Sequence, residues 1–287
     1  MNGGLELIKF GITSRSFGGL STEETAQRMR DAGFECCELC FVQSDLGGWN
    51  YNGIGDLTGI TPETVKAAAD TYRKYGIEVV ALGVFSNLLE RDAEKKKDVI
   101  DYFIRYLDFA EAAGIPVIAS ECGFVPGDRG LHADSYEADF KSVKDALVVI
   151  GKEAEKRGIK IAIEGCVLDV VPTPKRLRDM AGQLKAEAGL TNIGALLDPA
   201  NYIAAADEDD MFKYLSNLVY YFHGKDRFVN DTYGRNVGEG EINWCKFFKN
   251  HMDITPDIPV VFEYSNKDNC KEVLDRAKKY YNWALNS

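Results

Sequence analysis

Four polar residues, each at the end of a short apolar run, have types and spacing that suggest chemistry. The runs cover 159–165, 192–199, 218–226 and 258–264, and their polar residues are Glu164, Asp198, His223 and Glu263. Runs of this length, rich in apolar and β-branched residues, are typical of buried parallel strands. A carboxylate or an imidazole has little structural reason to end such a strand. Three carboxylates with one imidazole therefore indicate a divalent metal site.

Strands and helices alternate along the rest of the chain and are expected to position these residues. Four further apolar runs predict strands over 7–14, 34–41, 77–85 and 116–123, which makes eight strands in all. The longest helices are expected over 92–113, 135–157, 174–188 and 269–285. Helix starts are marked by a capping box at Ser21 and Glu24 and by Thr-Pro pairs at 61–62 and 173–174.

Eight such units with no Gly/Pro/Ser-rich linker predict a single α/β domain over 1–287, a (β/α)₈ TIM barrel. A doubly wound open sheet is the alternative, but the segment 11–19 (GITSRSFGG) does not fit the Gly-rich phosphate loop expected after its first strand. Successive candidate residues are 25 to 40 positions apart, which places them on the fifth to eighth strands. At the C-terminal ends of barrel strands, their side chains converge.

Composition narrows the classes of partner. A net charge of −11 argues against general nucleic-acid binding and gives no support for an anionic membrane surface. No apolar run approaches the roughly 18 residues of a membrane span, and the first residues lack the pattern of a signal peptide. The seven cysteines are interpreted as reduced thiols, so a cytoplasmic enzyme is expected, and a homo-oligomer stays open.

The second half of the chain resembles a known family, the xylose isomerase-like sugar (phosphate) isomerases and epimerases. The motifs IAIEG, LLDPAN, FHGKD, GEGEINW and VFEY occur in the order and spacing of that family, which includes tagatose/psicose 3-epimerases and inosose dehydratase and isomerase. The resemblance implies a divalent metal ion (Mn, Co, Mg or Zn) held by Glu164, Asp198, His223 and Glu263. It also implies that Glu164 and Glu263 act as acid and base on a small carbohydrate substrate.

This double role is chemically consistent. A divalent ion that binds a carbonyl and an adjacent hydroxyl acidifies the C–H next to the carbonyl and stabilises an enediolate. Two carboxylates on opposite sides of the carbon can then remove a proton from one face and return it to the other. Asn201 departs from the ketose epimerases, which commonly have a histidine at that position. An amide can still bind a substrate hydroxyl.

Further residues are candidates for binding a sugar, a sugar phosphate or a related keto-polyol. The loop after His223 contains Lys225, Arg227 and Arg235, which could hold a phosphate or a carboxylate. Alternatively, these cations pair with Asp226, Asp231 and Glu239. Glu121, at the end of the fourth strand, is expected either to contact substrate or to pair with a nearby charge.

Two motifs have simpler interpretations. Cys37-x-x-Cys40 has the spacing of a redox or zinc motif, but it lies in a strand-like run with no second Cys/His pair, so buried thiols are expected. Trp244 is expected to pack beneath the seventh barrel helix rather than to contact sugar.

The main hypothesis is a metal-dependent isomerase or epimerase that acts through an enediolate. A lyase that dehydrates an inosose-like keto-cyclitol, or cleaves an oxidised glycoside, requires the same enolate and is the alternative. Endonuclease IV shares the barrel family, but its zinc site uses many histidines and this chain has three. A barrel that serves only as a binding subunit is expected to lack ligands, and all four are present here.

Overall fold

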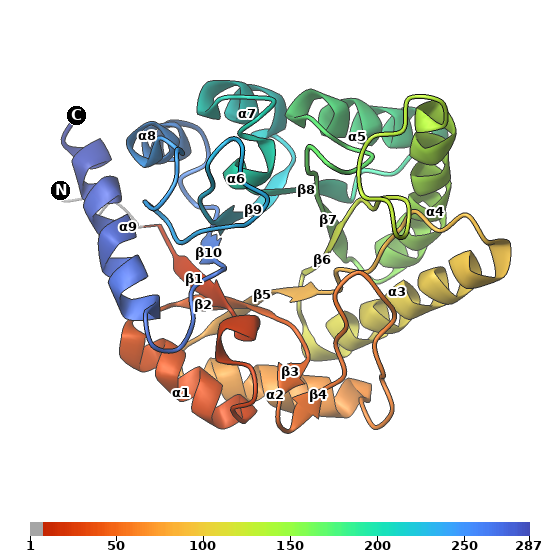
Figure 1. The fold of residues 1–287 in the computed structure, drawn as a ribbon. Helices are drawn as coiled ribbons and strands as arrows, with labels where there is room; N and C mark the ends of the chain where they lie inside the picture. Colours follow the sequence, from red (N-terminus) through yellow and green to blue (C-terminus); the bar gives the residue numbers. More distant parts are fainter. Residues whose placement is uncertain (1–7) are drawn as a thin grey trace.

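The protein forms a closed barrel of eight parallel strands surrounded by helices (Figure 1), in a computed structural model that describes residues 8–287. The hydrogen-bonded order is β1-β10-β9-β8-β7-β6-β5-β2, and the last strand pairs again with β1. The barrel strands are β1 Phe10–Thr13, β2 Cys36–Leu39, β5 Glu78–Gly83, β6 Val117–Glu121, β7 Lys160–Glu164, β8 Ile193–Leu197, β9 Val219–Gly224 and β10 Val260–Phe262. The predicted TIM barrel is therefore confirmed. Leu7, the first residue of the predicted strand 7–14, lies outside the described residues, as do the other residues of 1–7 on which the expected lack of a signal peptide partly rests.

Helices form the outer layer of the barrel (Figure 1). They are α1 Thr22–Ala32, α2 Pro62–Lys74, α3 Ala93–Ala113, α4 Tyr136–Lys156, α5 Pro174–Ala188, α6 Pro199–Tyr202, α7 Glu208–Leu215, α8 Trp244–Ile254 and α9 Cys270–Leu285, with a short 3₁₀ turn at Ser14–Phe17. The predicted capping box is present, because Ser21 and Glu24 each accept a hydrogen bond from the other's backbone N–H. Among residues 8–287, no helix has the combination of length and apolar character that crossing a membrane requires.

Side chains alternate along each strand, and this alternation aims the candidate residues into the barrel. Successive residues of a strand point to opposite faces, so a residue and the one two positions later share a face. The inner apolar cluster includes Ala162, Leu196, Tyr221 and Val261. Each lies two positions before one of the four candidate residues, which therefore continue the inward-facing series to the mouth of the barrel.

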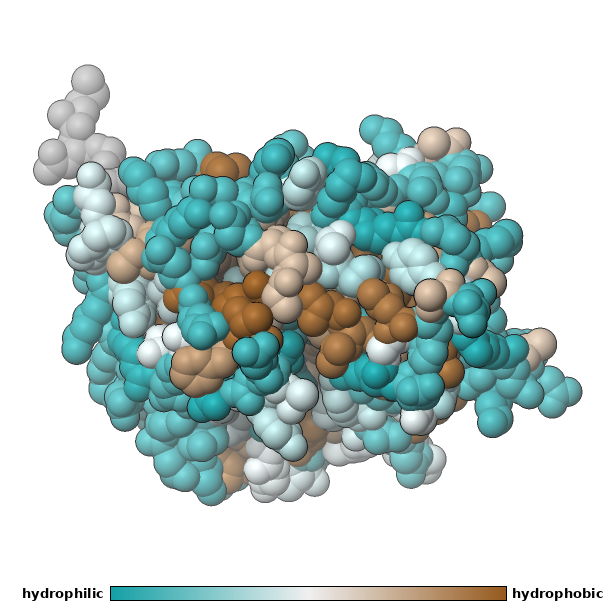
Figure 2. All heavy atoms as spheres, turned by 45° about the horizontal axis from the view of Figure 1, so that its top comes forward, coloured by the Kyte–Doolittle hydropathy of each residue, from teal (hydrophilic) through white to brown (hydrophobic). Residues whose placement is uncertain are grey.

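The connections at the C-terminal strand ends form the face where the candidate residues emerge. The segment after β2 is the most elaborate, since it contains the antiparallel pair β3 (Val42–Gln43) and β4 (Leu46–Gly47) and continues to α2. Figure 2 shows apolar side chains gathered across the middle of one face, with polar side chains around them. Many exposed large hydrophobic residues belong to these connections: Tyr51, Ile54, Leu131, Leu168, Phe228, Val229, Tyr233 and Tyr264.

Candidate active site and metal centre

The four predicted ligands meet at the mouth of the barrel. Glu164 is the last residue of β7, Asp198 and Glu263 directly follow β8 and β10, and His223 is the penultimate residue of β9. One ligand atom from each lies within 4.8 Å of the others, and all four residues are buried. Three carboxylate oxygens and one imidazole nitrogen at this separation suit a divalent cation. The residues present therefore fit the metal that the strand-end pattern implies.

The imidazole of His223 is oriented by a carboxylate that lies behind it. Nδ1 lies 3.1 Å from Glu164 Oε1, on the side of the cluster, while Nε2 lies 3.0 Å from Glu38 Oε2. Tyr221 donates its hydroxyl to the same Glu38 oxygen at 2.5 Å. An Nε2–H that donates to Glu38 leaves the Nδ1 lone pair directed at the cluster, as in metal-binding histidines whose second nitrogen is held by a carboxylate.

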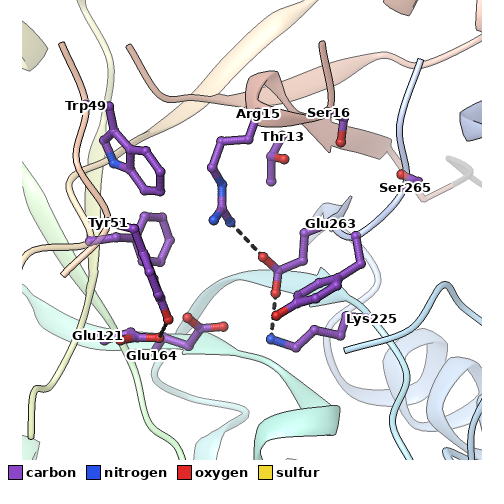
Figure 3. A pocket seen from close by; sticks show the side chains of 12 residues that line it. Thr13, Arg15, Ser16, Trp49, Tyr51, Glu121, Glu164, Lys225, Glu263 and Ser265 are labelled. Atoms are coloured by element: carbon purple, nitrogen blue, oxygen red, sulfur yellow. Dashed lines mark hydrogen bonds and ion pairs between the residues drawn. The ribbon is translucent and has the colours of Figure 1, made fainter. Parts of the chain in front are cut away.

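Two cations lie against the carboxylates of this cluster (Figure 3). Lys225 Nζ lies 2.5 Å from Asp198 Oδ2 and 2.6 Å from Glu263 Oε1, and an Arg15 NH2 group donates to Glu263 Oε2 at 2.6 Å. Burial disfavours the Glu263 carboxylate, but Lys225, His223 and Arg15 outweigh it and lower the pKa of Glu263. Burial raises the pKa of Asp198 to about 7; the carboxylates of Glu164 and Glu263 act in the same direction, and Lys225 opposes them.

A cavity of about 410 Å³ opens above the cluster and has aromatic walls (Figure 3). Its aromatic lining residues are Trp49, Tyr51, Phe85 and Tyr264. Phe85 and Tyr264 have left-handed backbones, with φ of 44° and 63°, although neither is glycine. Such strain costs about 1–3 kcal/mol and is concentrated at functional sites. We name this space the main cavity.

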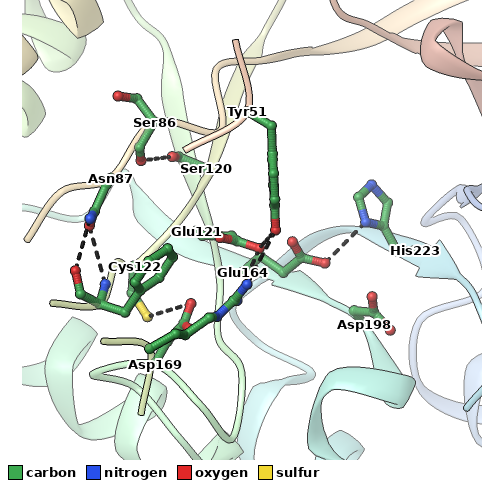
Figure 4. Close-up of polar contacts among 12 residues, drawn as sticks. Tyr51, Ser86, Asn87, Ser120, Glu121, Cys122, Glu164, Asp169, Asp198 and His223 are labelled. Carbon is green, nitrogen blue, oxygen red and sulfur yellow. Dashed lines mark hydrogen bonds and ion pairs between the residues drawn. The ribbon is translucent and has the colours of Figure 1, made fainter. Parts of the chain in front are cut away.

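Glu121 lines the main cavity and has one oxygen free. It ends β6, in register with Glu164 on β7. Oε1 accepts hydrogen bonds from the Tyr51 hydroxyl at 2.5 Å and from Arg129 at 3.4 Å, whereas Oε2 is buried without a partner among the described residues (Figure 4). Burial raises the pKa of Glu121. The free oxygen is available to a substrate hydroxyl.

The other substrate-binding candidates differ in position. Lys225 lines the main cavity, as Glu121 does, but Asn201, Arg227 and Arg235 are not among its lining residues. Asn201 is buried in α6, and Arg227 is 8% exposed. Arg235 pairs with Asp231 at 2.5 Å, as the alternative interpretation of the basic loop predicts.

Three residues at this site were not singled out from the sequence: Arg15, Glu38 and Tyr51. Glu38 carried a related signal, since it is a carboxylate inside the apolar run 34–41, whereas each of the four candidate residues ends its run. The neighbouring cysteines are buried free thiols, as expected. Arg15 directly follows the first predicted strand, but a lone cation after a strand has no distinctive pattern.

The fold and the site together define a class of protein: a (β/α)₈ barrel with a buried cluster of three carboxylates and one histidine at its strand ends. The family model described as xylose isomerase-like TIM barrel matches residues 26–283, and the chain belongs to this family. Among curated proteins, no sequence matches this chain.

Solved structures with the same fold include several carbohydrate enzymes. A D-tagatose 3-epimerase-like protein has a TM-score of 0.76 at 18% identity and covers 97% of this chain and 100% of its own. The IolI protein, solved with a bound zinc atom, has a TM-score of 0.75 at 16% identity (97% and 99% covered). The 3-keto-D-glucoside 4-epimerase YcjR of E. coli has a TM-score of 0.74 at 14% identity (95% and 99%). At such identities the likeness shows the fold alone.

Proposed function

We propose that this protein is a divalent-metal-dependent isomerase or epimerase of a keto sugar or related polyol, acting through an enediolate. The observation that carries the proposal is the convergence of Glu164, Asp198, His223 and Glu263 within 4.8 Å, beneath a cavity of sugar-binding size. The epimerases among the solved structures support the same assignment.

These four residues would hold the metal ion, and Mn²⁺, Co²⁺, Mg²⁺ and Zn²⁺ all suit the donor set. Bound there, the ion would act as a Lewis acid that makes the C–H beside a substrate carbonyl more acidic. Glu38 would keep His223 in the tautomer that presents Nδ1.

Glu164 and Glu263 are the proposed proton carriers. They belong to β7 and to the segment after β10, which β8 and β9 separate in the barrel, so their carboxylates reach the centre from different directions. A proton removed by one and returned by the other to the opposite face gives epimerisation. Return to the neighbouring carbon gives aldose–ketose isomerisation.

The charge of the main cavity favours an uncharged substrate over a sugar phosphate. Arg15 and Lys225 are the cations among its described lining residues, and both contact site carboxylates. Arg235, which could otherwise have held a phosphate, pairs with Asp231. Both cavity-lining cations are already paired with carboxylates and so are not available to bind a phosphate. A sugar hydroxyl, in contrast, can donate to the free oxygen of Glu121, and the aromatic walls can pack against the sugar ring.

A lyase is the second candidate, and Glu121 favours it. Dehydration requires an acid that protonates the departing hydroxyl, in addition to the base that forms the enolate. Glu121 is a third carboxyl group in the main cavity, and burial raises its pKa, which favours the protonated form.

Proton NMR in D₂O, with Mn²⁺ and a panel of free ketoses, sugar phosphates and keto-cyclitols, tests the proposal. We expect deuterium to be incorporated at the carbon beside the carbonyl of an uncharged substrate. Apart from this deuterium, the product should be an isomer of the substrate. Release of water or of an aglycone would identify the lyase. Deuterium uptake by sugar phosphates alone would contradict the charge argument.

Variants Glu164→Gln and Glu263→Gln test the proton carriers. Each is expected to lower deuterium exchange by at least about 100-fold, the smaller end of general acid–base contributions. Metal content, measured on the same samples, separates lost proton transfer from lost metal. Substantial exchange in both variants would overturn these roles.

A further inference from the structure

A second cavity of about 410 Å³ lies beside the main cavity. It is formed by residues 52–54 of the segment after β4, by 86–87 after β5 and by 124, 126 and 127 after β6, with the first two turns of α3 at its edge. We name it the side cavity. Nothing in the proposed proton transfer uses it.

The two cavities share one wall. Tyr51 lines the main cavity and Asn52 the side cavity, and Phe85 and Ser86 divide in the same way. After β6, Glu121 faces the main cavity and Phe124 the side cavity. Two segments thus present adjacent residues to the two cavities, and a third presents residues three positions apart, so the cavities lie on either side of these segments.

The wall is held in a strained conformation. Asn52 and Phe85 have left-handed backbones, with φ of 57° and 44°, and the Asn52 N–H donates to the Phe85 carbonyl at 2.8 Å. Gly123, with φ of 106°, leaves no room for a side chain, because a Cβ there would lie 2.4 Å from Asn87 Oδ1. Left-handed backbone at non-glycine residues is costly and is retained where it serves a site.

Unsatisfied polar atoms point to a ligand in the side cavity. Ser86 Oγ and Asn52 Oδ1 are buried without a hydrogen-bond partner among the described residues, and Ser86 is 1% exposed. In Figure 4 the Ser86 hydroxyl points away from Tyr51 and Glu164. The amide of Asn87, in contrast, is used within the wall itself: it donates to the Phe124 carbonyl and accepts from the Leu89 N–H. A buried polar group without a partner destabilises the structure, and a ligand hydroxyl would supply the missing hydrogen bond.

The remaining lining suits an uncharged ring. Ile54, Phe124 and Pro126 offer apolar surface for the C–H faces of a sugar. The charged lining residues are two carboxylates and one ammonium, Glu90, Asp98 and Lys95, which together disfavour an anion. Apolar surface with a few convergent polar groups is the usual composition of a small-molecule site.

We propose that the side cavity binds a second, uncharged sugar ring, so that the substrate is a disaccharide or similar glycoside whose reacting ring occupies the main cavity. The glycosidic link would cross the solvent-exposed edge of the shared wall at Tyr51, which is 45% exposed and is held by its hydrogen bond to Glu121. This inference rests on the proposed function, because it assigns the reacting sugar to the metal centre.

The test compares ketose disaccharides with free ketoses. The probes are turanose, maltulose, lactulose and isomaltulose against D-fructose and D-tagatose, with Mn²⁺, read by deuterium uptake and by saturation-transfer difference NMR. We expect at least one disaccharide to have a higher kcat/KM than the free ketoses. Its second ring should receive saturation from the protein.

Three substitutions test the wall directly. Ser86→Ala removes the hydroxyl, and Asn52→Gly removes the amide but keeps the left-handed backbone accessible. Each should lower the ratio of kcat/KM for the disaccharide to that for the free ketose by about 2- to 10-fold, the worth of one hydrogen bond. The control Ser216→Ala, at the end of α7, should leave this ratio as in the unaltered protein. The bulkier Ser86→Leu should abolish saturation of the second ring.

The outcomes separate this inference from the proposed function. Uptake by free ketoses without binding of any disaccharide, or an unchanged ratio in all three wall variants, would overturn the side cavity and leave the proposed function standing. Uptake by no sugar at all would overturn the proposed function. In that case the side cavity would still be tested by binding alone. Saturation transfer to the second ring that is lost in Ser86→Leu would support it, and absence of saturation transfer would overturn it.

Discussion

At the scale of single residues, Glu38 is the least obvious part of the proposed metal centre. It is fully buried, and one of its oxygens lies within hydrogen-bond distance of both the His223 ring and the Tyr221 hydroxyl. Carboxylates in this position fix the orientation of a metal-binding histidine and increase its basicity. The contact joins residues 185 positions apart, so it depends on closure of the barrel and no local pattern predicts it.

Glu38→Gln should weaken metal binding without removing a ligand. The amide can still contact the ring but lacks the charge that orients it, and such substitutions cost roughly 10- to 100-fold in metal affinity. Competition of the purified protein with a fluorescent chelator for Mn²⁺ or Zn²⁺ measures the effect. Glu35→Gln, an exposed neighbour, is the matched control. Equal affinities for both variants would show that Glu38 does not support His223.

At the scale of elements, one carboxylate organises the connection between β9 and α8. Asp226, fully buried, accepts hydrogen bonds from the backbone of Arg227, Gly238 and Ile242 and from the Trp244 indole, at 2.8 to 3.1 Å. The indole contact agrees with the expectation that Trp244 is buried rather than exposed to sugar. Asp226, interpreted from sequence as a partner for basic side chains, instead anchors this connection.

Asp226→Asn should loosen the connection. An amide nitrogen replaces one acceptor oxygen, so buried N–H groups lose their partner and the free energy of unfolding should fall by about 2–3 kcal/mol. Hydrogen exchange should accelerate between residues 227 and 243. Asp231→Asn, which breaks only a partly exposed pair with Arg235, should cost less than about 1 kcal/mol. Equal exchange rates in the two variants would contradict the anchoring role.

Regular elements were predictable, whereas the connections between them were not. The eight strands and the long helices follow from apolar runs and caps such as Ser21, which are local signals. The pair β3 and β4 has two residues in each strand, too few to show a period of two. Tyr51 and Asn52 lie in the same segment and are positioned by contacts with β5 and β6, so their roles appear only in three dimensions.

At the scale of the whole molecule, His251 links the outer layer to the barrel. It lies in α8, fully buried, and its Nε2–H donates to the Ile258 carbonyl at 2.7 Å, just before β10. Burial lowers the pKa of His251 to about 4. Because the folded pKa lies below the unfolded value of 6.5, the neutral ring contributes stability above pH 6.5, and this contribution is lost as pH falls towards 4.

His251→Gln should flatten this part of the stability profile. The drop in pKa from 6.5 to about 4 corresponds to about 3 kcal/mol lost between these pH values in the unaltered protein. Denaturant unfolding at pH 7 and pH 4.5, with a chelator present, measures the difference. The variant should lose less stability over the same interval. A pH dependence identical to that of the unaltered protein would exclude His251 as its source.

The barrel was predictable as a whole because its closure needs only eight alternating units. The tight contacts within the barrel were harder to predict. Gly194 in β8 is one example, because a Cβ there would clash with the carbonyl oxygen of Leu218, just before β9. The cluster of four polar residues at the strand ends was predictable because each of them ends an apolar run. The side cavity was not, because Ser86 and Asn52 are ordinary loop residues until the wall places them together.

The hydrogen bond between Asn52 and Phe85 has a consequence for protein engineering. Two segments that are far apart along the chain share one strained backbone unit, so neither can be grafted alone onto another barrel with its conformation intact. A chimera would need residues 48–54 and 84–88 to be exchanged as a pair. Libraries that randomise one segment at a time would mostly disrupt the shared backbone conformation, whereas libraries that vary both segments together could change the ligand that the cavity accepts.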